Sequence, residues 1–229
     1  MGFFKIRKLV LENRTMEIDR KNHWETVYET KLPNEVSWTQ ENPKTSLEFI
    51  RGTNLDKSAK IIDIGGGDSK LIDFLLEEGY ENVTVLDISE KALERAKIRL
   101  GKNAGKVNWI VSDITEFKPE IPYDIWHDRA TFHFLTTPDQ IETYVRTIEK
   151  WVSGFLIIGT FSENGPTKCS GLEIKQYSET AIENQFSDSF KKIKCLTEDH
   201  VTPFETKQNF TFCIFEKIKL APTEFLSNI

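Results

Sequence analysis

Short apolar runs alternate with amphipathic stretches along the chain from about residue 60 onward. Residues 60–64 form a β-branched run that enters a glycine turn at residues 65–67. Apolar side chains then recur at helical spacing until Gly79, where a helix naturally ends. A second run at residues 83–86 precedes a second helical stretch that begins at Ser89, a good N-cap. The pattern predicts two consecutive strand–helix units.

The same order continues through the middle of the chain. Residues 107–111 and 123–127 predict the third and fourth strands. Residues 137–140 match a capping box with proline at the first helical position, and apolar side chains follow at helical spacing. Residues 154–161 are almost entirely apolar, as expected of a strand that is buried on both faces of a parallel sheet.

The end of the chain has a different pattern. Residues 190–196 and 209–218 are strand-like runs, joined by a loop that contains Pro203, with no helix of adequate length between them. Such a connection favours an antiparallel hairpin. We therefore predict a doubly wound α/β fold for residues 45–229, preceded by a helical or lid-forming segment over residues 1–44.

Composition narrows the candidate partners. A chain of 229 residues fits one large α/β domain. The formal net charge of -6 argues against non-specific electrostatic binding of phosphate backbones, so nucleic acid is not an expected partner. The three cysteines are odd in number and lack metal-like spacing, which predicts free thiols, with neither a disulfide nor a zinc site.

Residues 1–10 mix aromatic and basic side chains but lack the uninterrupted apolar run of a signal peptide. We therefore expect a cytoplasmic protein that does not associate with membranes, as a monomer or a homodimer. The basic, acid-poor opening of the chain leaves an organellar presequence as the alternative.

The strongest local signal is the segment from Asp63 to Ser69, Asp-Ile-Gly-Gly-Gly-Asp-Ser. Gly65 and Gly67 let the backbone turn sharply and approach a ligand, and the next helix start offers free N–H groups to a carboxylate. Asp87 ends the second predicted strand, where a carboxylate can accept both ribose hydroxyls of a nucleoside, and Asp113 ends the third. Each feature alone fits a plain turn or a helix cap, but the combination predicts a nucleoside cofactor.

These motifs resemble those of class I S-adenosylmethionine-dependent methyltransferases over roughly residues 45–218. The segment from Asp63 to Ser69 resembles their first motif, although Ser69 replaces its third glycine, and Val111 to Ile114 resembles their third. The resemblance implies a Rossmann-like seven-stranded sheet, mostly parallel with an antiparallel C-terminal hairpin, and S-adenosyl-L-methionine as cofactor. The cofactor-binding residues that it implies are Asp63, Gly65, Gly67, Asp87, Ile88, Asp113, Ile114 and His127.

In that family the residue matched by Asp63 lies close to the ammonium group of the cofactor, and the one matched by Asp113 accepts from the adenine amino group. A nicotinamide-dependent dehydrogenase is the alternative on the same fold, since it also uses a glycine turn and an acid after the second strand. Asp63 argues against it, because an aspartate just before the first glycine would repel a pyrophosphate.

The segment at the end of the fourth strand contains several side chains that could bind or act on an acceptor. Asp128 and Arg129 resemble the Trp-Asp-Arg segment of thiopurine-type methyltransferases, where residues face the methyl group. This implies that Asp128 or His133 takes or orients a proton of the acceptor, and that Arg129 holds an anionic part of it. Alternatively, Asp128 and Arg129 pair with each other or cap a helix, and His133 is a polar group of the core.

An aromatic leader that includes Trp24, Tyr28 and Trp38 precedes the first strand. It resembles the leaders of methyltransferase-like lysine modifiers, which shape the acceptor pocket. We expect Trp38 to form a lid, whereas Trp24 fits a helix face that packs on the sheet equally well. Tyr177, in the polar segment after the fifth strand, is expected to contact the acceptor, or else to belong to a surface connection.

The function expected from these features is methyl transfer by in-line displacement, with catalysis that comes mainly from positioning. The acceptor is a small molecule or a protein side chain, because one fold serves thiol, hydroxyl, amine and lysine acceptors alike. A regulatory module that binds the cofactor without turnover is the alternative outside enzymes.

Overall fold

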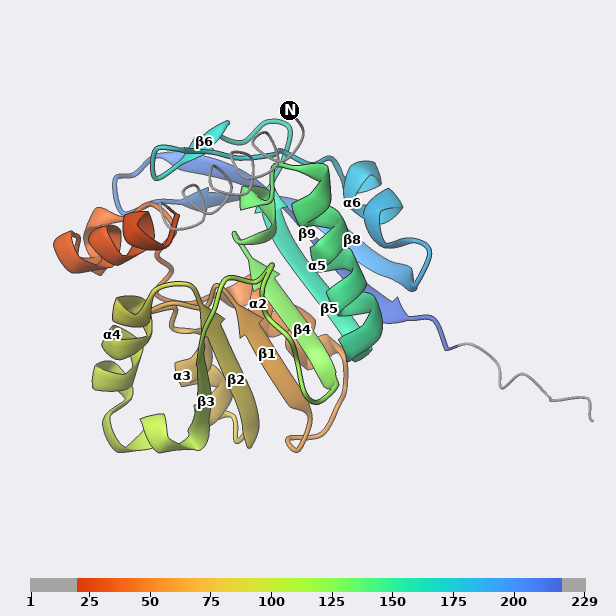
Figure 1. Cartoon of the computed structure of the whole chain (residues 1–229), viewed down its shortest axis with the longest axis horizontal. Helices are drawn as coiled ribbons and strands as arrows, with labels where there is room; N and C mark the ends of the chain where they lie inside the picture. The colour runs from red at the N-terminus through yellow and green to blue at the C-terminus, as the bar shows by residue number, and fades with distance from the viewer. Residues whose placement is uncertain (1–19, 220–229) are drawn as a thin grey trace, which may run out of the picture.

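The computed structural model of the protein describes residues 20–219. Their centre is a seven-stranded sheet with the strand order β3-β2-β1-β4-β5-β9-β8 (Figure 1). Its strands are β1 (Lys60–Ile64), β2 (Asn82–Asp87), β3 (Val107–Val111), β4 (Tyr123–Arg129), β5 (Val152–Phe161), β8 (Phe190–Val201) and β9 (Lys207–Lys217). Strands β1 to β5 run parallel, and β9 pairs antiparallel with both β5 and β8. The predicted mostly parallel sheet with an antiparallel C-terminal hairpin is confirmed.

The strand order reverses between β1 and β4. From β1 the chain adds β2 and β3 on one side, and it then returns to place β4 on the other side of β1. The connections on the two sides therefore leave the sheet in opposite directions at the carboxyl ends of β1 and β4. Open α/β sheets bind their ligands in the crevice at such a point.

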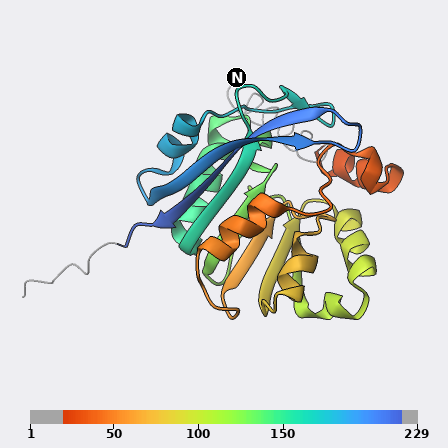
Figure 2. The same cartoon turned by 180° about the vertical axis from the view of Figure 1, so that it is seen from behind.

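Helices cover both faces of the sheet (Figures 1 and 2). Alternation along each strand decides which core a residue joins, so Ile61 packs with α2, α3 and α4 and Ile62 with α5 and α6. The bounds of these helices are α2 (Lys44–Gly52), α3 (Leu71–Glu77), α4 (Glu90–Leu100), α5 (Pro138–Trp151) and α6 (Glu179–Phe186). Residues 20–30 form a further helix ahead of them, here called the N-terminal helix.

Side-chain caps explain where the helices begin. The hydroxyls of Ser89 and Thr137 accept backbone N–H groups at the starts of α4 and α5, as predicted. The sequence pattern does not predict α6, which is capped by Ser178, because its eight residues bury only two side chains. The remaining elements are short, namely η1 (Pro33–Glu35), η2 (Gly101–Lys106), η3 (Phe132–Phe134), β6 (Lys168–Cys169) and β7 (Leu172–Glu173).

The expectation of free thiols is wrong for two of the three cysteines. Cys195 on β8 and Cys213 on β9 are partners in the antiparallel ladder, with their Cα atoms 4.1 Å apart, and they form a disulfide. Cys169 is free and buried. The spacing of the cysteines in the sequence does not reveal the register of the hairpin, and that register brings these two together.

Among residues 20–219, no helix is long and apolar enough to cross a lipid bilayer, and no group of histidine, cysteine and acidic side chains is arranged to hold a metal ion. The opening residues 1–10, on which the expected localisation depends, lie outside the described residues.

Candidate functional site

A cavity of about 410 Å³ lies at the carboxyl ends of β1 to β4, where the strand order reverses. Most of the residues predicted for the site line this cavity. These are Asp63, Gly65, Asp87, Ile88, Asp113, Ile114, His127, Trp38 and Arg129. The predicted residues that do not line it are Gly67, Asp128, His133 and Tyr177.

The glycine turn after β1 forms part of the cavity wall. The backbone N–H of Gly65 donates to the carbonyl of Leu86 at 2.7 Å, at a φ of 64° that favours glycine. A Cβ on Gly65 would stand 1.8 Å from the hydroxyl oxygen of Thr131. Two residues further along the turn, a Cβ on Gly67 would stand 2.7 Å from the Tyr28 hydroxyl oxygen. The turn therefore needs glycine both for its conformation and for lack of space.

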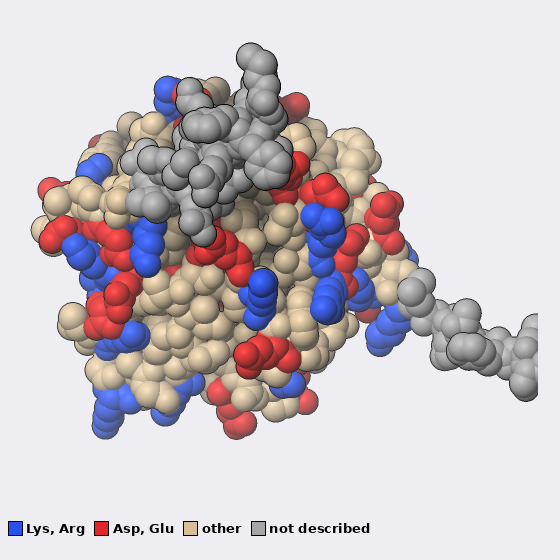
Figure 3. Space-filling model, in the orientation of Figure 1, with Lys and Arg blue, Asp and Glu red and all other residues tan. Residues whose placement is uncertain are grey.

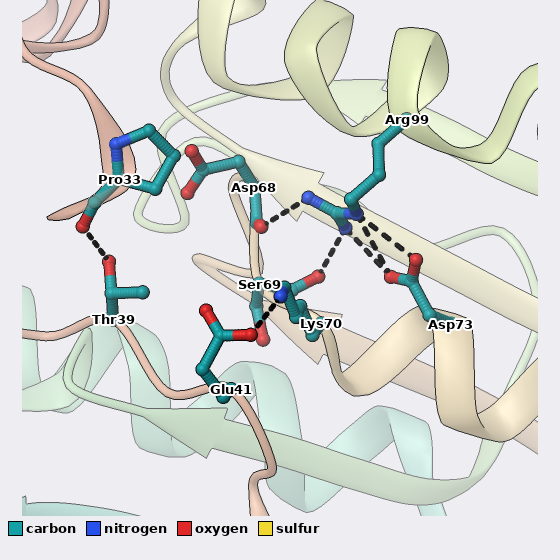
Figure 4. Close-up of polar contacts among 8 residues, drawn as sticks. All are labelled: Pro33, Thr39, Glu41, Asp68, Ser69, Lys70, Asp73 and Arg99. Atoms are coloured by element: carbon teal, nitrogen blue, oxygen red, sulfur yellow. Dashed lines mark hydrogen bonds and ion pairs between the residues drawn. The ribbon is translucent and has the colours of Figure 1, made fainter.

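Arg99, at the end of α4, holds the backbone that follows the glycine turn (Figure 4). Its guanidinium donates to the carbonyl of Asp68 at 2.6 Å and to that of Ser69 at 2.7 Å. Lys70, the next residue, pairs with Glu41 of the connector that precedes α2. These bonds fix the turn against α4 on one side and against the connector on the other.

Asp63 and His127 are partners on the neighbouring strands β1 and β4, and both are buried. The Nδ1 of His127 lies 2.7 Å from the Asp63 carboxylate, and its Nε2 lies 2.8 Å from the Ser46 hydroxyl on α2. An ionised carboxylate can only accept, so Nδ1 donates to it. His127 thus orients a carboxylate at the wall of the cavity, where an ammonium group would be stabilised. No motif in the sequence points to Ser46.

Asp87 ends β2 as a buried carboxylate that accepts the Ser89 backbone N–H at 2.8 Å. Burial raises its pKa to about 7, and the charges of Asp68 and Asp63 act in the same direction. Hydroxyl donors from a ligand would stabilise the ionised form. Asp68, which follows the glycine turn directly, also lines the cavity, and burial raises its pKa as well.

Asp113 follows β3 at the far side of the cavity. One carboxylate oxygen accepts the backbone N–H and the hydroxyl of Thr115, at 2.8 and 2.7 Å. The other accepts from Arg20 of the N-terminal helix at 2.8 Å. Asp113 therefore holds its own loop and this helix, and its expected contact with an adenine amino group stays a prediction.

Alternation along β4 separates residues that adjoin in the sequence. His127 and Arg129 line the cavity, whereas Asp128 is fully buried on the opposite face of the sheet, toward α5. Its carboxylate accepts the Tyr144 hydroxyl at 2.8 Å and two backbone N–H groups of the turn after β4. Burial raises its pKa to about 6. The expectation that Asp128 acts on the acceptor is therefore corrected, since its side chain lies outside the cavity and holds the turn after β4, of which Thr131 lines the cavity.

His133 and Tyr177 are also buried away from the cavity. The His133 ring stacks on Phe161 with centroids 4.6 Å apart, and burial lowers its pKa to about 3, so it is uncharged near neutral pH. Tyr177 packs on Phe132 in the core, with centroids 5.0 Å apart. Neither side chain can reach an acceptor in the cavity, which corrects both expectations.

Trp38 lines the cavity, as expected, together with other aromatic rings. Trp24 of the N-terminal helix contacts Trp38 and Phe134 edge to face, with centroids 5.5 and 5.2 Å apart, and both neighbours also line the cavity. Glu25 anchors the helix, because its carboxylate accepts the Glu90 backbone N–H at the start of α4 at 2.8 Å. The helical spacing of Trp24 predicts that its ring packs on the rest of the protein, but it does not predict that the ring lines a cavity.

Charges outside the cavity are mixed. On the face drawn in Figure 3, the lysines and arginines of the described residues are interspersed with aspartates and glutamates rather than gathered into one basic surface. The expectation that nucleic acid is not a partner stays a prediction.

The sequence is similar to those of known methyltransferases. A family described as "Methyltransferase domain" matches residues 61–153, which contain the glycine turn and all three strand-end aspartates. The eEF1A lysine and N-terminal methyltransferase of Mus musculus is 22% identical over 147 residues, which cover 63% of this chain and 20% of that protein. Malonyl-[acyl-carrier protein] O-methyltransferase 1 of Ilyobacter polytropus is 25% identical over 152 residues, which cover 66% of this chain and 53% of that protein. Residues 61–153 are thus matched to a methyltransferase domain, and the fold and strand-end motifs are those of class I S-adenosylmethionine-dependent methyltransferases.

The fold of this methyltransferase is shared with solved structures. N-methyltransferase NodS from Bradyrhizobium japonicum WM9, crystallised with S-adenosyl-L-homocysteine, superposes with a TM-score of 0.63 at 17% identity, covering 79% of this chain and 90% of that one. S-adenosyl-L-methionine is the cofactor of the family, in place of the nicotinamide alternative. The cavity fits it, since Gly65 leaves the backbone open, Asp87 offers a buried acceptor to hydroxyls and Asp63 suits an ammonium group.

Proposed function

We propose that this methyltransferase transfers a methyl group by in-line displacement to a nucleophile on a small molecule. One observation supports this most directly. The cavity is lined both by strand-end carboxylates and by aromatic rings together with Arg129, so one space offers both a cofactor site and an acceptor site. The bound cofactor supplies an electrophilic methyl group, and the protein supplies the geometry.

Each strand-end residue receives a role in this proposal. Asp63, oriented by His127, binds the ammonium group at the amino-acid end of the cofactor. Asp87 accepts the two ribose hydroxyls in its ionised form. The residues assigned to the adenine ring are Ile88, Asp113 and Ile114.

The proposal assigns no general base. Asp128 and His133 are both buried outside the cavity, so neither can meet the nucleophile. Holding a nucleophile in line with a reactive carbon can by itself supply several kcal/mol of a barrier, on the order of 7 kcal/mol or more in well-oriented systems. Positioning therefore carries the rate in this account.

A small acceptor is favoured because two segments that line the cavity, through Trp24 and Cys169, contact each other. The N-terminal helix approaches the β6–β7 hairpin, with the Nε2 of His23 3.3 Å from the Ser170 hydroxyl. A protein lysine is the second candidate. The aromatic rings of Trp24, Trp38 and Phe134 favour it, since such rings attract an ammonium group, and the Mus musculus relative is named for lysine methylation.

Methyl-labelled S-adenosylmethionine and a cell lysate, separated afterwards into small molecules and protein, test the proposal. We expect label among the small molecules, lost with Asp63→Asn and retained with Asp139→Asn, an exposed carboxylate on α5. Label in the protein fraction would support the lysine candidate. Cofactor binding without any transfer would instead indicate a regulatory module.

A further inference from the structure

The wall of the cavity changes charge from one strand to the next. In spatial order, β3, β2 and β1 end at or near Asp113, Asp87 and Asp63, and the next strand, β4, ends at Arg129. All four side chains line the cavity. The carboxylates suit the hydroxyl and cationic groups of the cofactor, whereas a guanidinium calls for an anion.

The guanidinium of Arg129 donates a hydrogen bond through only one of its nitrogens among the described residues. Its Nη1 donates to the backbone carbonyl of Trp38 at 3.0 Å. Its Nε and Nη2 are buried and find no hydrogen-bond partner among residues 20–219. These two nitrogens lie on one edge of the guanidinium, whose parallel N–H groups match the two oxygens of a carboxylate. A buried charged donor without a partner is costly, so this edge is built for a ligand.

Acidic side chains near Arg129 are committed elsewhere. Glu198 and Asp63 both act to raise its pKa, which burial lowers to about 10, so the group is still charged at neutral pH. The Glu198 carboxylate accepts the Thr45 hydroxyl at 2.7 Å, and Asp63 is held by His127. They keep the guanidinium charged and leave its Nε and Nη2 free.

Apolar groups surround this free edge. Trp38, Phe134 and Leu135 line the same cavity, and the guanidinium of Arg129 lies 5.0 Å from the centre of the Phe210 ring. Building on the proposed function, we propose that the methyl acceptor is a small organic acid with an apolar body, whose carboxylate pairs with Nε and Nη2 of Arg129. The rings of Trp38 and Phe134 then pack on the apolar body of the acid. The two parallel N–H groups of Arg129, here called the guanidinium fork, fix the orientation of its carboxylate.

The carboxylate of the cofactor is the competing source of the same chemistry. The backbone N–H groups of Gly65 and Gly66 both donate to the carbonyl of Leu86, which holds the glycine turn against β2. Arg129 lies on the other side of β1, paired with Gly159 of β5 and against Phe210 of β9. The position of Arg129 beside β5 and β9, away from Asp87 and Asp113, favours the acceptor as its partner.

The test uses the full-length protein saturated with S-adenosylhomocysteine. Benzoate, phenylacetate and naphthoate are titrated beside their uncharged amides, and binding is followed by NMR. We expect at least one acid to bind about tenfold or more tightly than its amide. Arg129→Gln should remove that preference, and Arg129→Lys, which keeps the charge without the fork, should reduce it.

The control variant is Lys44→Gln. Lys44 is exposed at the start of α2, pairs with Glu48 and does not line the cavity. The preference for acids should survive this change in the saturated protein, although both variants remove one positive charge. Loss of the preference in both variants would mean that the overall charge of the protein, and not the paired Nε and Nη2 of Arg129, selects acids, and it would overturn the proposal.

Two further results would overturn it. One is a wild-type protein that binds no acid better than its amide. The other is an Arg129→Gln variant that loses about tenfold or more affinity for S-adenosylhomocysteine but none for 5′-methylthioadenosine, because Arg129 would then hold the cofactor. Methyl transfer is measured separately on the wild type, so failure of the proposed function is distinguished from failure of the carboxylate site.

Discussion

The two sides of the cavity are built in different ways. On the cofactor side, Asp63, Gly65 and Asp87 each belong to a strand and the turn that directly follows it. On the acceptor side, Trp24, Trp38 and Arg129 come from the N-terminal helix, a connector and β4, which are distant in sequence. Local motifs therefore describe the first side, whereas the second exists only once the chain has folded.

The largest expected effect on cofactor affinity comes from Gly65→Ala. The new Cβ would collide with the Thr131 hydroxyl at a φ that disfavours alanine, so the turn must move away from its ligand-binding position. We expect affinity for S-adenosylhomocysteine to fall roughly a hundredfold or more, measured by calorimetry.

Gly79→Ala is the matched control, because Gly79 also has positive φ, at 85°, but a Cβ there meets nothing within 4 Å. It should lower stability by about 1 kcal/mol without changing cofactor affinity. Equal losses of affinity in the two variants would contradict the role given to the glycine turn.

The next largest effect separates two buried aspartates. Asp87→Ala should weaken S-adenosylhomocysteine binding about ten- to a hundredfold, because ribose hydroxyls lose a charged acceptor worth about 1.5–3 kcal/mol. Its ligand-free melting temperature should fall only slightly, because burial disfavours the ionised carboxylate and the Ser89 N–H is the main donor that loses its acceptor. Asp128→Ala should have the larger effect on the melting temperature, through the bonds lost to Tyr144 and the turn, and the smaller effect on cofactor affinity, because its side chain lies outside the cavity. The reverse pattern would show that the two roles are exchanged.

These two aspartates also show what the sequence can and cannot predict. Strand periodicity and helix caps predict β1 to β5, the C-terminal hairpin and the strand-end position of Asp87. The motif around Asp128 resembles a catalytic segment, yet the side chain faces α5 and not the cavity. Which face it takes depends on which residues of β4 point to each side of the sheet. The partners of Trp24 and of Cys195 likewise depend on tertiary contacts and strand register, which a single sequence does not encode locally.

A smaller effect should follow pH. The folded pKa of Asp87 is about 7, and the ribose hydroxyls require its ionised form, so affinity for S-adenosylhomocysteine should rise about tenfold from pH 6 to pH 8. The ligand-free protein should behave in the opposite sense. A carboxyl whose pKa is raised on folding binds protons more tightly in the native state, so this group's contribution to stability falls as pH rises from about 4 to about 7. Calorimetry across pH, with Asp87→Asn as the flat reference, checks both trends.

Reducing the Cys195–Cys213 disulfide should have the smallest effect on the site. The bond closes a hairpin of sequence separation 18, so its loss should cost about 3 kcal/mol of stability, in the chain-entropy estimate. No side chain of the disulfide lines the cavity, so affinity for S-adenosylhomocysteine should not change. A melting curve and a titration with and without reductant measure both quantities, and a loss of affinity would mean that the hairpin shapes the cofactor side.

Titration of S-adenosylhomocysteine and of NAD into the purified wild-type protein tests the central claim most directly. Carboxylates at three successive strand ends, one of them beside the glycine turn, should accept an ammonium group and ribose hydroxyls but repel a pyrophosphate. We predict a saturable heat of binding for S-adenosylhomocysteine that decreases in affinity with Asp87→Ala, and none for NAD. Tight binding of NAD with no response to S-adenosylhomocysteine would contradict the account.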